Sequence, residues 1–478
     1  MAAASNPTMP KATNIIIVGA GPAGVRAALR AAELGARATL VTSGEFGGMA
    51  ANDGPIPVRT LAHAARLIRN ARQLPQYGIV VSEPVLDYSQ LLARVHDVVE
   101  DVRAHSARRQ DFDSLGITVH EHAGAARFTD PNTIETQSGL RLQAEAIILC
   151  TGGVSRRLPL PGFELTCTHS DAWGLNAVPR SMLVIGAGAT GAQVASIFNA
   201  FGTHIQLFQA GPRILPTEDE SVSAEVAMEF RAAGIELREN FGSIESFEKT
   251  AKGIRMNFSK DGSRESAEAA LAVVAVGWVA STSGMDLAAA GVEINERSFV
   301  KVNKYLQTTA PHIFAAGDVT GGLMLAPQAV QAGFVAATNA VQGPSLPFWN
   351  EVSPIGSFTD PEYAQVGLTE AKARENYDVL TTIIRFESVA RAIIDGRKGG
   401  FCKLIMDRKT YRILGCHVVG ERAVDITQMA AIAISAGMKV NDFLRIPLSF
   451  PTYSGVLIRA ASVAARELNL PIGLDCTF

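Results

Sequence analysis

The sequence predicts an α/β protein with two parallel-sheet repeats of the doubly wound type, followed by a smaller α+β domain. Near the N-terminus an apolar strand, a glycine-rich loop and an alanine-rich helix follow one another, and the same series returns in the middle of the chain. Beyond about Phe348, predicted strands and hairpins replace this pattern. At 478 residues and 47% hydrophobic composition, the chain can form about three domains with large cores.

The first repeat starts with an apolar run at residues 14–18, which is typical of a buried strand. The helix expected over 25–35 ends on glycine, and a second strand follows at 38–41. Apolar residues at helical spacing predict a long helix over 88–108. A further apolar run at 146–150 completes the repeat.

The second repeat has a strand at 181–185, a helix at 192–201 and a strand at 204–208. This internal duplication predicts two Rossmann-like dinucleotide-binding units in one chain. The last block has no such loop. Its hairpin over 400–419 and its helix over 423–437 predict a separate α+β domain with a role in dimerisation.

Each repeat carries a GxGxxG loop between its first strand and its helix. In such a loop the first glycine forms the tight turn, the second lets the backbone approach a pyrophosphate, and the third lets the helix pack on the strand. The helix N-terminus then offers N–H groups and the positive end of its dipole to the phosphates. The glycines are Gly19, Gly21 and Gly24 in the first loop, and Gly186, Gly188 and Gly191 in the second.

Neither repeat ends its second strand with the acid that usually binds a ribose hydroxyl. The first has Thr42 there, with Glu45 slightly displaced, and the second has Gln209. An uncharged Gln209 would not repel a 2′-phosphate, and Arg213 lies close enough in sequence to attract one. The second loop is therefore expected to accept NADPH, and NADH as well. For Arg213 itself, a role as a solvated turn residue remains an equal alternative.

A strand that ends in Gly317-Asp318 ahead of a helix suggests a further cofactor contact. A carboxylate at this place can bind a ribityl hydroxyl, although an ordinary helix-capping turn would look the same. Together with the first glycine loop, Asp318 favours flavin binding.

These segments, in this order, resemble the pyridine nucleotide–disulfide oxidoreductase family, which includes dihydrolipoyl dehydrogenase and mercuric reductase. The resemblance implies FAD in the first repeat, NAD(P)H in the second and a homodimer. It further implies cofactor contacts at Gly48, Gly124, Thr151, Gly152 and Gly277. The implied domains are 1–160 and 286–347 for FAD binding, 161–285 for NAD(P) binding, and 348–478 for dimerisation.

The chain departs from the family pattern where the redox chemistry lies. Ala50 and Pro55 occupy the positions of the family's two redox cysteines, and neither can form a thiolate. Phe450 and Gly455 replace the C-terminal His and Glu that move protons in the family.

A family lysine near the flavin is replaced by Arg59, and its glutamate partner by Gln193. A buried arginine that faces a neutral amide needs another partner, which the sequence does not identify. Arg59 is expected to stabilise negative charge on the reduced ring, and Gln193 is counted with the nucleotide-site residues.

The predicted function is therefore hydride transfer from NAD(P)H to FAD and then directly to a quinone-type acceptor. A flat acceptor would lie in an apolar slot beside the flavin, with Phe450 and Tyr453 of the partner subunit as candidate walls. Interface packing alone would explain these two aromatic residues equally well. A soluble transhydrogenase and a non-catalytic flavin-binding dimer remain alternatives.

Composition sets the remaining expectations. A net charge of −3 and a pI of about 6.3 argue against a nucleic-acid partner. No cysteine spacing suggests a zinc site or a disulfide framework, and Cys476 is a lone terminal thiol. His120 and His122 could share one strand face, but the sequence places no third ligand nearby, so no metal is expected. We expect a cytoplasmic protein without a membrane span.

Overall fold

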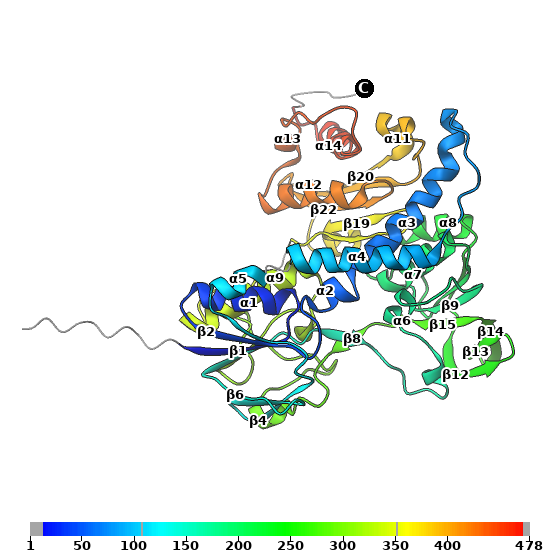
Figure 1. Ribbon diagram of the computed structural model, residues 1–478. Helices are drawn as coiled ribbons and strands as arrows, with labels where there is room; N and C mark the ends of the chain where they lie inside the picture. The colour runs from blue at the N-terminus through cyan, green and yellow to red at the C-terminus, as the bar shows by residue number, and fades with distance from the viewer. Residues whose placement is uncertain (1–12, 107–108, 350–351, 472–478) are drawn as a thin grey trace, which may run out of the picture. The chain divides into compact units, whose positions relative to one another are not determined.

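The structure of the protein is a computed structural model that describes residues 13–106, 109–349 and 352–471. It confirms the α/β fold class, with two parallel sheets and a C-terminal antiparallel sheet (Figure 1). The chain divides into two compact units. Unit 1 comprises the described residues up to Val58, 93–155 and 278–349, and unit 2 comprises 59–92, 156–277 and the described residues from 352 on.

Unit 1 contains a five-stranded parallel sheet with the strand order β17-β7-β1-β2-β3. Its strands are β1 (Asn14–Val18), β2 (Arg37–Val41), β3 (Thr118–His120), β7 (Ala146–Leu149) and β17 (Ile313–Ala315). Ile17, Leu40 and Ile148 have no exposed surface, because both faces of a parallel sheet are covered. The continuous apolar runs of the sequence reflect this burial.

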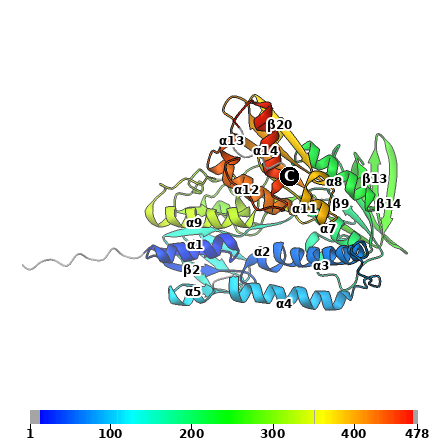
Figure 2. The ribbon, with the colours of Figure 1, turned by 90° about the horizontal axis from the view of Figure 1, so that it is seen from above.

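Two helices of unit 1 lie side by side, α1 (Pro22–Glu33) and α9 (Ala326–Gln342) (Figure 2). They approach closely, since a Cβ added to Gly333 would lie 2.1 Å from the Ala23 carbonyl oxygen. The remaining helical segments of unit 1 are α2 (Gly48–Asn52), α5 (Arg109–Ser114), η3 (Leu287–Ala290) and η4 (Asp318–Thr320). The small antiparallel sheets are β4 (Ala126–Asp130), β5 (Thr133–Thr136) and β6 (Arg141–Gln143), and β8 (Gly153–Ser155) with β16 (Trp278–Ala280).

Unit 2 contains the second parallel sheet, with the order β11-β10-β9-β15. Its strands are β9 (Ser181–Ile185), β10 (His204–Gln209), β11 (Glu236–Glu239) and β15 (Leu271–Val274). An antiparallel sheet, β12 (Ser243–Thr250), β13 (Gly253–Lys260) and β14 (Ser263–Ala269), precedes β15 in the chain. The helical segments are η2 (Phe163–Leu165), α6 (His169–Trp173), α7 (Ala189–Ala200) and α8 (Glu220–Ala232).

The C-terminal part of unit 2 is a five-stranded antiparallel sheet in the order β18-β19-β22-β21-β20. Its strands are β18 (Ile355–Ser357), β19 (Tyr363–Gly367), β20 (Val379–Arg385), β21 (Phe401–Asp407) and β22 (Ile413–Val419). Side chains alternate between its faces, so Cys402 and Cys416 join the apolar core while Lys403 and His417 point to the other face. The helical segments are α10 (Glu370–Arg374), η5 (Phe386–Ser388), α11 (Ala390–Ile394), α12 (Ala423–Ser435), α13 (Val440–Phe443) and α14 (Gly455–Glu467).

The unit boundary falls within two long helices, α3 (Pro55–Gln73) and α4 (Tyr88–Ser106), with η1 (Leu74–Tyr77) between them. Helix α4 is the helix expected over 88–108, and its last two expected residues lie outside the described part of the chain. None of the helices in the described ranges is long and apolar enough to cross a membrane.

Candidate functional site

The first glycine loop connects β1 to α1 in unit 1. Gly19 has φ +108°, and a Cβ at this position would lie 2.2 Å from the Cys150 carbonyl oxygen. A Cβ on Gly24 would lie 1.8 Å from the Gly19 carbonyl oxygen. Gly21 is the N-cap residue of α1 and gives the helix no side-chain cap. The loop therefore leaves the N-terminal N–H groups of α1 open to a phosphate.

The segment that holds the redox cysteines in the family packs against this loop. Gly48 has φ +57°, and a Cβ there would lie 2.6 Å from Gly21 Cα. The Gly47 N–H also donates to the Ala20 carbonyl oxygen at 2.9 Å. Ala50 lies in the single turn of α2, and Pro55 is the first residue of α3.

Asp318 lies beside the same loop and provides a test of the fit to FAD. Gly317, which precedes it, packs with its Cα near Ala23 in the first turn of α1, since an added Cβ would lie 3.1 Å from Ala23 Cβ. Burial raises the pKa of Asp318. The hydroxyl of Thr151, at the C-terminal end of β7, is buried and has no hydrogen-bond partner among the described residues. A partly buried carboxyl group and a buried hydroxyl without a hydrogen-bond partner fit a bound ligand that carries hydroxyl groups, such as FAD.

The other predicted FAD contacts also lie in unit 1. Gly152 has φ +76°, its carbonyl accepts from Ser281 N–H at 3.0 Å, and an added Cβ would meet no atom within 4 Å. Gly124 has φ +74° and packs against Gln137, with 2.6 Å between an added Cβ and Gln137 Cβ. The Thr42 carbonyl accepts from Ala123 N–H at 3.0 Å, which ties the end of β2 to the Gly124 turn.

A cluster of charged side chains from separate segments lies at the ends of β2 and β3. Donor atoms of Glu45, Glu121 and His122 lie within 4.8 Å of one another, so His122 has potential co-ligands that the sequence spacing did not reveal. His120 is not part of this group. His122 Nε2 lies 3.4 Å from Glu45 Oε1, and Arg103 lies 3.9 Å from the other Glu45 oxygen. His122 and Arg103 thus lie beside the two carboxylate oxygens of Glu45.

The second glycine loop connects β9 to α7 in unit 2. A Cβ on Gly186 would lie 2.4 Å from the Ala275 carbonyl oxygen, and one on Gly191 would lie 1.8 Å from the Gly186 carbonyl oxygen. A Cβ on Gly188 would meet no atom within 4 Å, and α7 has no side-chain cap. This open approach to a helix N-terminus fits a nicotinamide dinucleotide. Gly277 follows β15 in the same unit, and its carbonyl accepts from Arg156 N–H at 2.9 Å.

Gln209 binds the second glycine loop directly. Its Oε1 accepts the Ala187 N–H at 3.0 Å, which leaves its Nε2 as a neutral donor at the end of β10. The structure does not support the expectation that Arg213 attracts a 2′-phosphate. Arg213 donates instead to the carbonyl oxygens of Leu215, Pro216 and Glu218 at 3.0–3.1 Å. Its guanidinium is therefore engaged within its own loop.

Arg59 and Gln193 have separate partners among the described residues. Gln193 Nε2 donates to the Ala189 carbonyl oxygen at 3.3 Å, one turn back along α7. The Arg59 guanidinium lies over the Phe358 ring, 3.2 Å from its centroid. Burial lowers the pKa of Arg59, and the carboxylates of Glu362 and Asp425 oppose that effect. The partner that the sequence did not identify is therefore an aromatic ring, with acids at longer range.

Other arginines of α3 contact the same segment of unit 2. Arg66 pairs with Glu362 at 3.1 Å and with Glu421, and Arg69 pairs with Asp360 at 3.1 Å. Phe358, Asp360 and Glu362 belong to one short segment that is distant from α3 in the sequence. No local signal connected it to α3.

Phe450 and Tyr453, both in unit 2, differ in exposure. Phe450 is 67% exposed, whereas Tyr453 is 8% exposed. The Tyr453 hydroxyl donates to Asp395 Oδ2 at 3.0 Å, and its ring packs against Phe386 with 6.0 Å between centroids. Burial and Asp395 together raise the pKa of Tyr453.

Tyr453 also lines a pocket of about 350 Å³. Its charged lining residues are Arg391, Asp395, Glu421, Arg422 and Asp425. The Tyr453 ring therefore packs in the apolar core, whereas its hydroxyl lies beside charged groups and is already engaged.

The four cysteines of the described chain are not reactive thiols. Cys150, Cys402 and Cys416 are buried, and Cys167 is partly buried. Burial raises the pKa of Cys150 and of Cys167, so both stay protonated near neutral pH. Cys402 and Cys416 Sγ lie 3.9 Å apart inside the apolar core, and the pKa of Cys402 is raised by that contact and by burial. Cys476 lies outside the described residues.

The chain matches two family models. Residues 13–333 match a model described as pyridine nucleotide-disulphide oxidoreductase, and residues 353–461 match the dimerisation domain of the same family. A mercuric reductase of Lysinibacillus sphaericus is 31% identical over 462 residues, which cover 95% of this chain and 83% of that enzyme. A dihydrolipoyl dehydrogenase of Thermus scotoductus is 32% identical over 467 residues, covering 96% of this chain and 98% of that enzyme.

A solved structure shares the fold. The HOCl-induced flavoprotein disulfide reductase RclA from Escherichia coli superposes with a TM-score of 0.84 at 24% identity, over 94% of this chain and 99% of that chain.

Proposed function

We propose that this chain, which belongs to the pyridine nucleotide-disulphide oxidoreductase family, reduces a quinone-type acceptor with NAD(P)H through FAD and without a redox disulfide. Members of this family are oxidoreductases that depend on FAD and use NAD(P)H. The match to the dimerisation domain indicates a homodimer. The acceptor and the absence of a disulfide step are the parts that we propose.

The observation that carries the proposal is the chemistry of the segment beside the first glycine loop. Ala50 in α2 and Pro55 at the start of α3 occupy the positions at which the resemblance expects cysteines. A methyl group and a pyrrolidine ring cannot attack a disulfide or carry electrons to one. Any acceptor of this protein would then have to take its electrons from the flavin.

The other cysteines do not offer a substitute. The pKa values of Cys150, Cys167 and Cys402 are raised, and Cys416 is buried. Phe450 and Gly455 likewise provide no proton donor at the place where the family has His and Glu. Loss of the thiols together with the proton shuttle favours an acceptor that needs no thiol and that would take its proton from solvent.

The chain's own residues would bind and orient the cofactors. Bound FAD would supply the chemistry, taking up a hydride from the nicotinamide and passing on two electrons. Gly19, Gly21 and Gly24 would admit its pyrophosphate to the N-terminus of α1, and the Asp318 carboxylate would accept a hydrogen bond from its ribityl chain. Gly48, Gly124, Thr151 and Gly152 would provide the remaining contacts to FAD.

The second glycine loop would hold the nicotinamide nucleotide. Gly186, Gly188 and Gly191 would receive its pyrophosphate, with Gln193, Gln209 and Gly277 as further contacts. A neutral Gln209 admits either nucleotide. In domain terms, we propose FAD binding by 1–160 and 286–347, NAD(P) binding by 161–285, and dimerisation by 348–478.

Arg59 would provide positive charge near the flavin, where the resemblance expects a lysine. Stacking on Phe358 would hold its guanidinium in one place. Phe450, with its exposed ring, is the candidate wall for a flat acceptor, whereas Tyr453 would position the loop that carries Phe450 through its bond to Asp395. Offset stacking of an acceptor on Phe450 would contribute about 1 kcal/mol.

An anaerobic stopped-flow experiment tests the proposal. The purified holoprotein is mixed with NADPH or NADH, and the flavin absorbance is followed before and after a quinone is added. We expect bleaching, then recovery that depends on the quinone. Turnover with glutathione disulfide or lipoamide that matches the quinone rate would overturn the proposal.

The same experiment separates the two alternatives. Recovery with NAD⁺ or NADP⁺ alone would identify a transhydrogenase, for which the neutral Gln209 is the favouring observation. Absence of bleaching in FAD-loaded protein would identify a non-catalytic flavin-binding dimer.

A further inference from the structure

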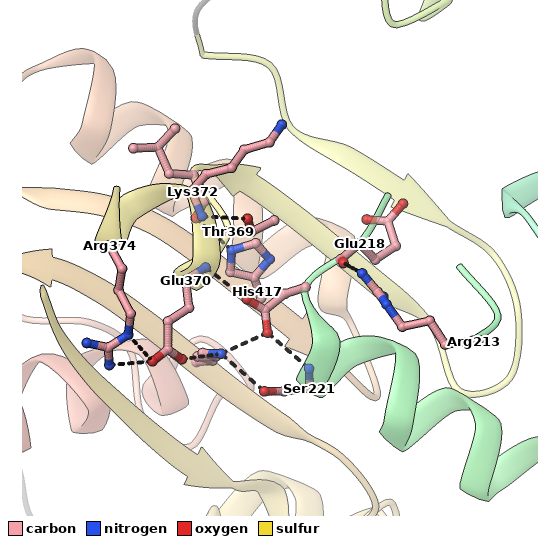
Figure 3. Close-up of polar contacts among 11 residues, drawn as sticks. Arg213, Glu218, Ser221, Thr369, Glu370, Lys372, Arg374 and His417 are labelled. Carbon is pink, nitrogen blue, oxygen red and sulfur yellow. Dashed lines mark hydrogen bonds and ion pairs between the residues drawn. The ribbon is translucent and has the colours of Figure 1, made fainter. Parts of the chain in front are cut away.

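Polar side chains at the start of α8 and in the C-terminal part of unit 2 form a cluster that includes Ser221, Glu370 and His417 (Figure 3). A buried lysine, Lys403, connects the two. The Lys403 side chain, on β21, is 4% exposed. Its Nζ lies 2.8 Å from Asp219 Oδ1 and 2.7 Å from Glu370 Oε2, and it donates to Ser221 Oγ at 3.1 Å. An ammonium group this deeply buried is stable only with such partners.

Asp219 uses both carboxylate oxygens to hold the start of α8. Oδ1 accepts the Ser221 N–H at 3.1 Å as an N-cap, and Oδ2 accepts the Glu370 N–H at 3.0 Å. Burial pushes the pKa of Asp219 upward, but the hydrogen bonds from Lys403 and from the Glu370 N–H lower it to about 2. Asp219 is therefore a carboxylate at every pH at which the enzyme would work.

The same contacts fix the loop between β10 and α8. Ser223 Oγ, in α8, donates to the Ile214 carbonyl oxygen at 2.6 Å. The Arg213 guanidinium donates hydrogen bonds to carbonyl oxygens of the same loop, including that of Leu215. Leu215 has φ +46°, a left-handed conformation that costs a non-glycine residue energy and persists only where its surroundings hold it.

The loop between β10 and α8 also contacts the second glycine loop. The Leu215 N–H donates to the Ala187 carbonyl oxygen at 2.8 Å, while the Ala187 N–H donates to Gln209 Oε1 at 3.0 Å. Both backbone polar groups of Ala187, between Gly186 and Gly188, are thus held by Gln209 at the end of β10 and by Leu215 within the loop that follows.

We propose that Lys403 is a positioning residue for the nicotinamide nucleotide: it fixes the N-terminus of α8, and through Leu215 it sets the Ala187 peptide of the second glycine loop. Affinity for the nucleotide then depends on a side chain of the C-terminal sheet. The inference rests on the proposed nucleotide role of this loop and is independent of the electron acceptor.

The neighbouring His417 and Arg374 have other partners, so the positioning role falls to Lys403. His417, the cross-strand neighbour on β22, bonds the Leu368 carbonyl oxygen through Nε2 at 2.9 Å. Burial lowers the pKa of His417, so its imidazole is neutral near pH 7. Arg374 also pairs with Glu370, at 2.5 Å, but its side chain is 55% exposed. Arg374 therefore provides a matched control that removes a cation from Glu370 without touching α8.

The test compares Lys403→Met with Arg374→Gln in the FAD-loaded protein. Calorimetric titration with NAD⁺ and NADP⁺ measures binding without turnover. For Lys403→Met we expect both dissociation constants to rise about tenfold, which corresponds to about 1.4 kcal/mol. The KM for NAD(P)H should rise in parallel, with kcat and the ratio of flavin to protein unchanged. Hydrogen exchange at residues 210–219 should become faster. Arg374→Gln should match the wild type in all of these.

The outcomes decide between positioning and simple stabilisation. Folded Lys403→Met protein with unchanged dissociation constants would overturn the proposal, even if its melting temperature fell. Should that variant fail to fold, Asp219→Asn keeps the N-cap oxygen and removes the charge that binds Lys403. We expect weaker nucleotide binding there too, and unchanged binding would equally reject the role. Failure of the quinone assay would leave these binding results intact.

Discussion

The two glycine loops have nearly the same backbone but different surroundings. Their N-cap residues, Gly21 and Gly188, have φ and ψ of −75° and −177°, and of −76° and −173°. The third glycine of each loop lies equally close to the first, with 1.8 Å between an added Cβ and the carbonyl oxygen of Gly19 or of Gly186. The duplicated sequence thus produces duplicated local geometry.

The difference lies in what covers each loop. An added Cβ on Gly21 would reach Gly48 Cα at 4.0 Å, because the α2 segment passes over the first loop. The same atom on Gly188 would meet nothing within 4 Å. The first loop is packed against the α2 segment at its second glycine, whereas the second is held by hydrogen bonds through Leu215 and Gln209 and has open space at its second glycine.

This contrast suits two different ligands. A covered loop suits a cofactor that stays bound, and an open loop suits a nucleotide that must arrive and leave in every cycle. The following predictions test that distinction, from the largest expected effect to the smallest.

Substitution of the third glycine should separate the two loops. Gly24→Ala would force a Cβ into the Gly19 carbonyl, and we expect loss of FAD with a destabilisation of about 4 kcal/mol or more. Gly191→Ala should weaken nucleotide binding while the purified protein retains its flavin. Flavin absorbance at purification and calorimetric titration measure the two effects.

Gly44→Ala is the control, because an added Cβ there meets no atom within 4 Å. Full flavin content in Gly24→Ala would show that the first loop is not the FAD site.

Glu218 should make stability depend on pH through the loop that supports the second glycine loop. Burial raises its pKa to about 7, from 4.5 in its exposed state. The folded state then binds this proton more tightly than the unfolded state, so stability falls as the pH rises from about 4.5 to about 7. Glu218→Gln should remove that fall and raise the unfolding free energy at pH 8 by up to about 3 kcal/mol.

Urea unfolding at pH 4 and at pH 8 measures this effect. The variant and the wild type should be equally stable at pH 4, where Glu218 is protonated in both states. An equal stability at pH 8 would mean that Glu218 is ionised at no cost in the folded protein.

Gln209 and Arg213 should differ in their effect on the choice of nucleotide. Gln209→Glu places a carboxylate where the 2′-phosphate would lie, and kcat/KM for NADPH should fall about tenfold to a hundredfold while that for NADH changes little. Arg213→Gln should leave the ratio of the two values unchanged, because the guanidinium binds only its own loop. A selective loss of NADPH activity in Arg213→Gln would restore the role that the sequence suggested.

Thiol alkylation should have the smallest effect. Treatment of the native holoprotein with N-ethylmaleimide should leave quinone turnover unchanged, since the cysteines of the described chain are buried or have raised pKa values. Inhibition that NADPH prevents or accelerates would point to a thiol in the electron path.

Much of the fold was predictable from local patterns. Both strand–loop–helix repeats were correctly located, because a glycine loop and its flanking strand and helix are encoded within about 30 consecutive residues. Boundaries were less exact. The helix expected over 25–35 runs from Pro22 to Glu33. The helix expected over 423–437 ends at Ser435.

What the sequence alone determined are the features whose causes are local. The glycines permit backbone shapes and close approaches that a side chain would forbid, and Ala50 and Pro55 lack a thiol whatever surrounds them. The tertiary structure alone decided which partners the charged and aromatic side chains meet. Arg59 lies on Phe358, Tyr453 bonds Asp395, and Lys403 binds Asp219, which lies 184 positions away in the chain. The reason is physical: such pairings depend on how distant segments pack, and no short stretch of sequence contains that information.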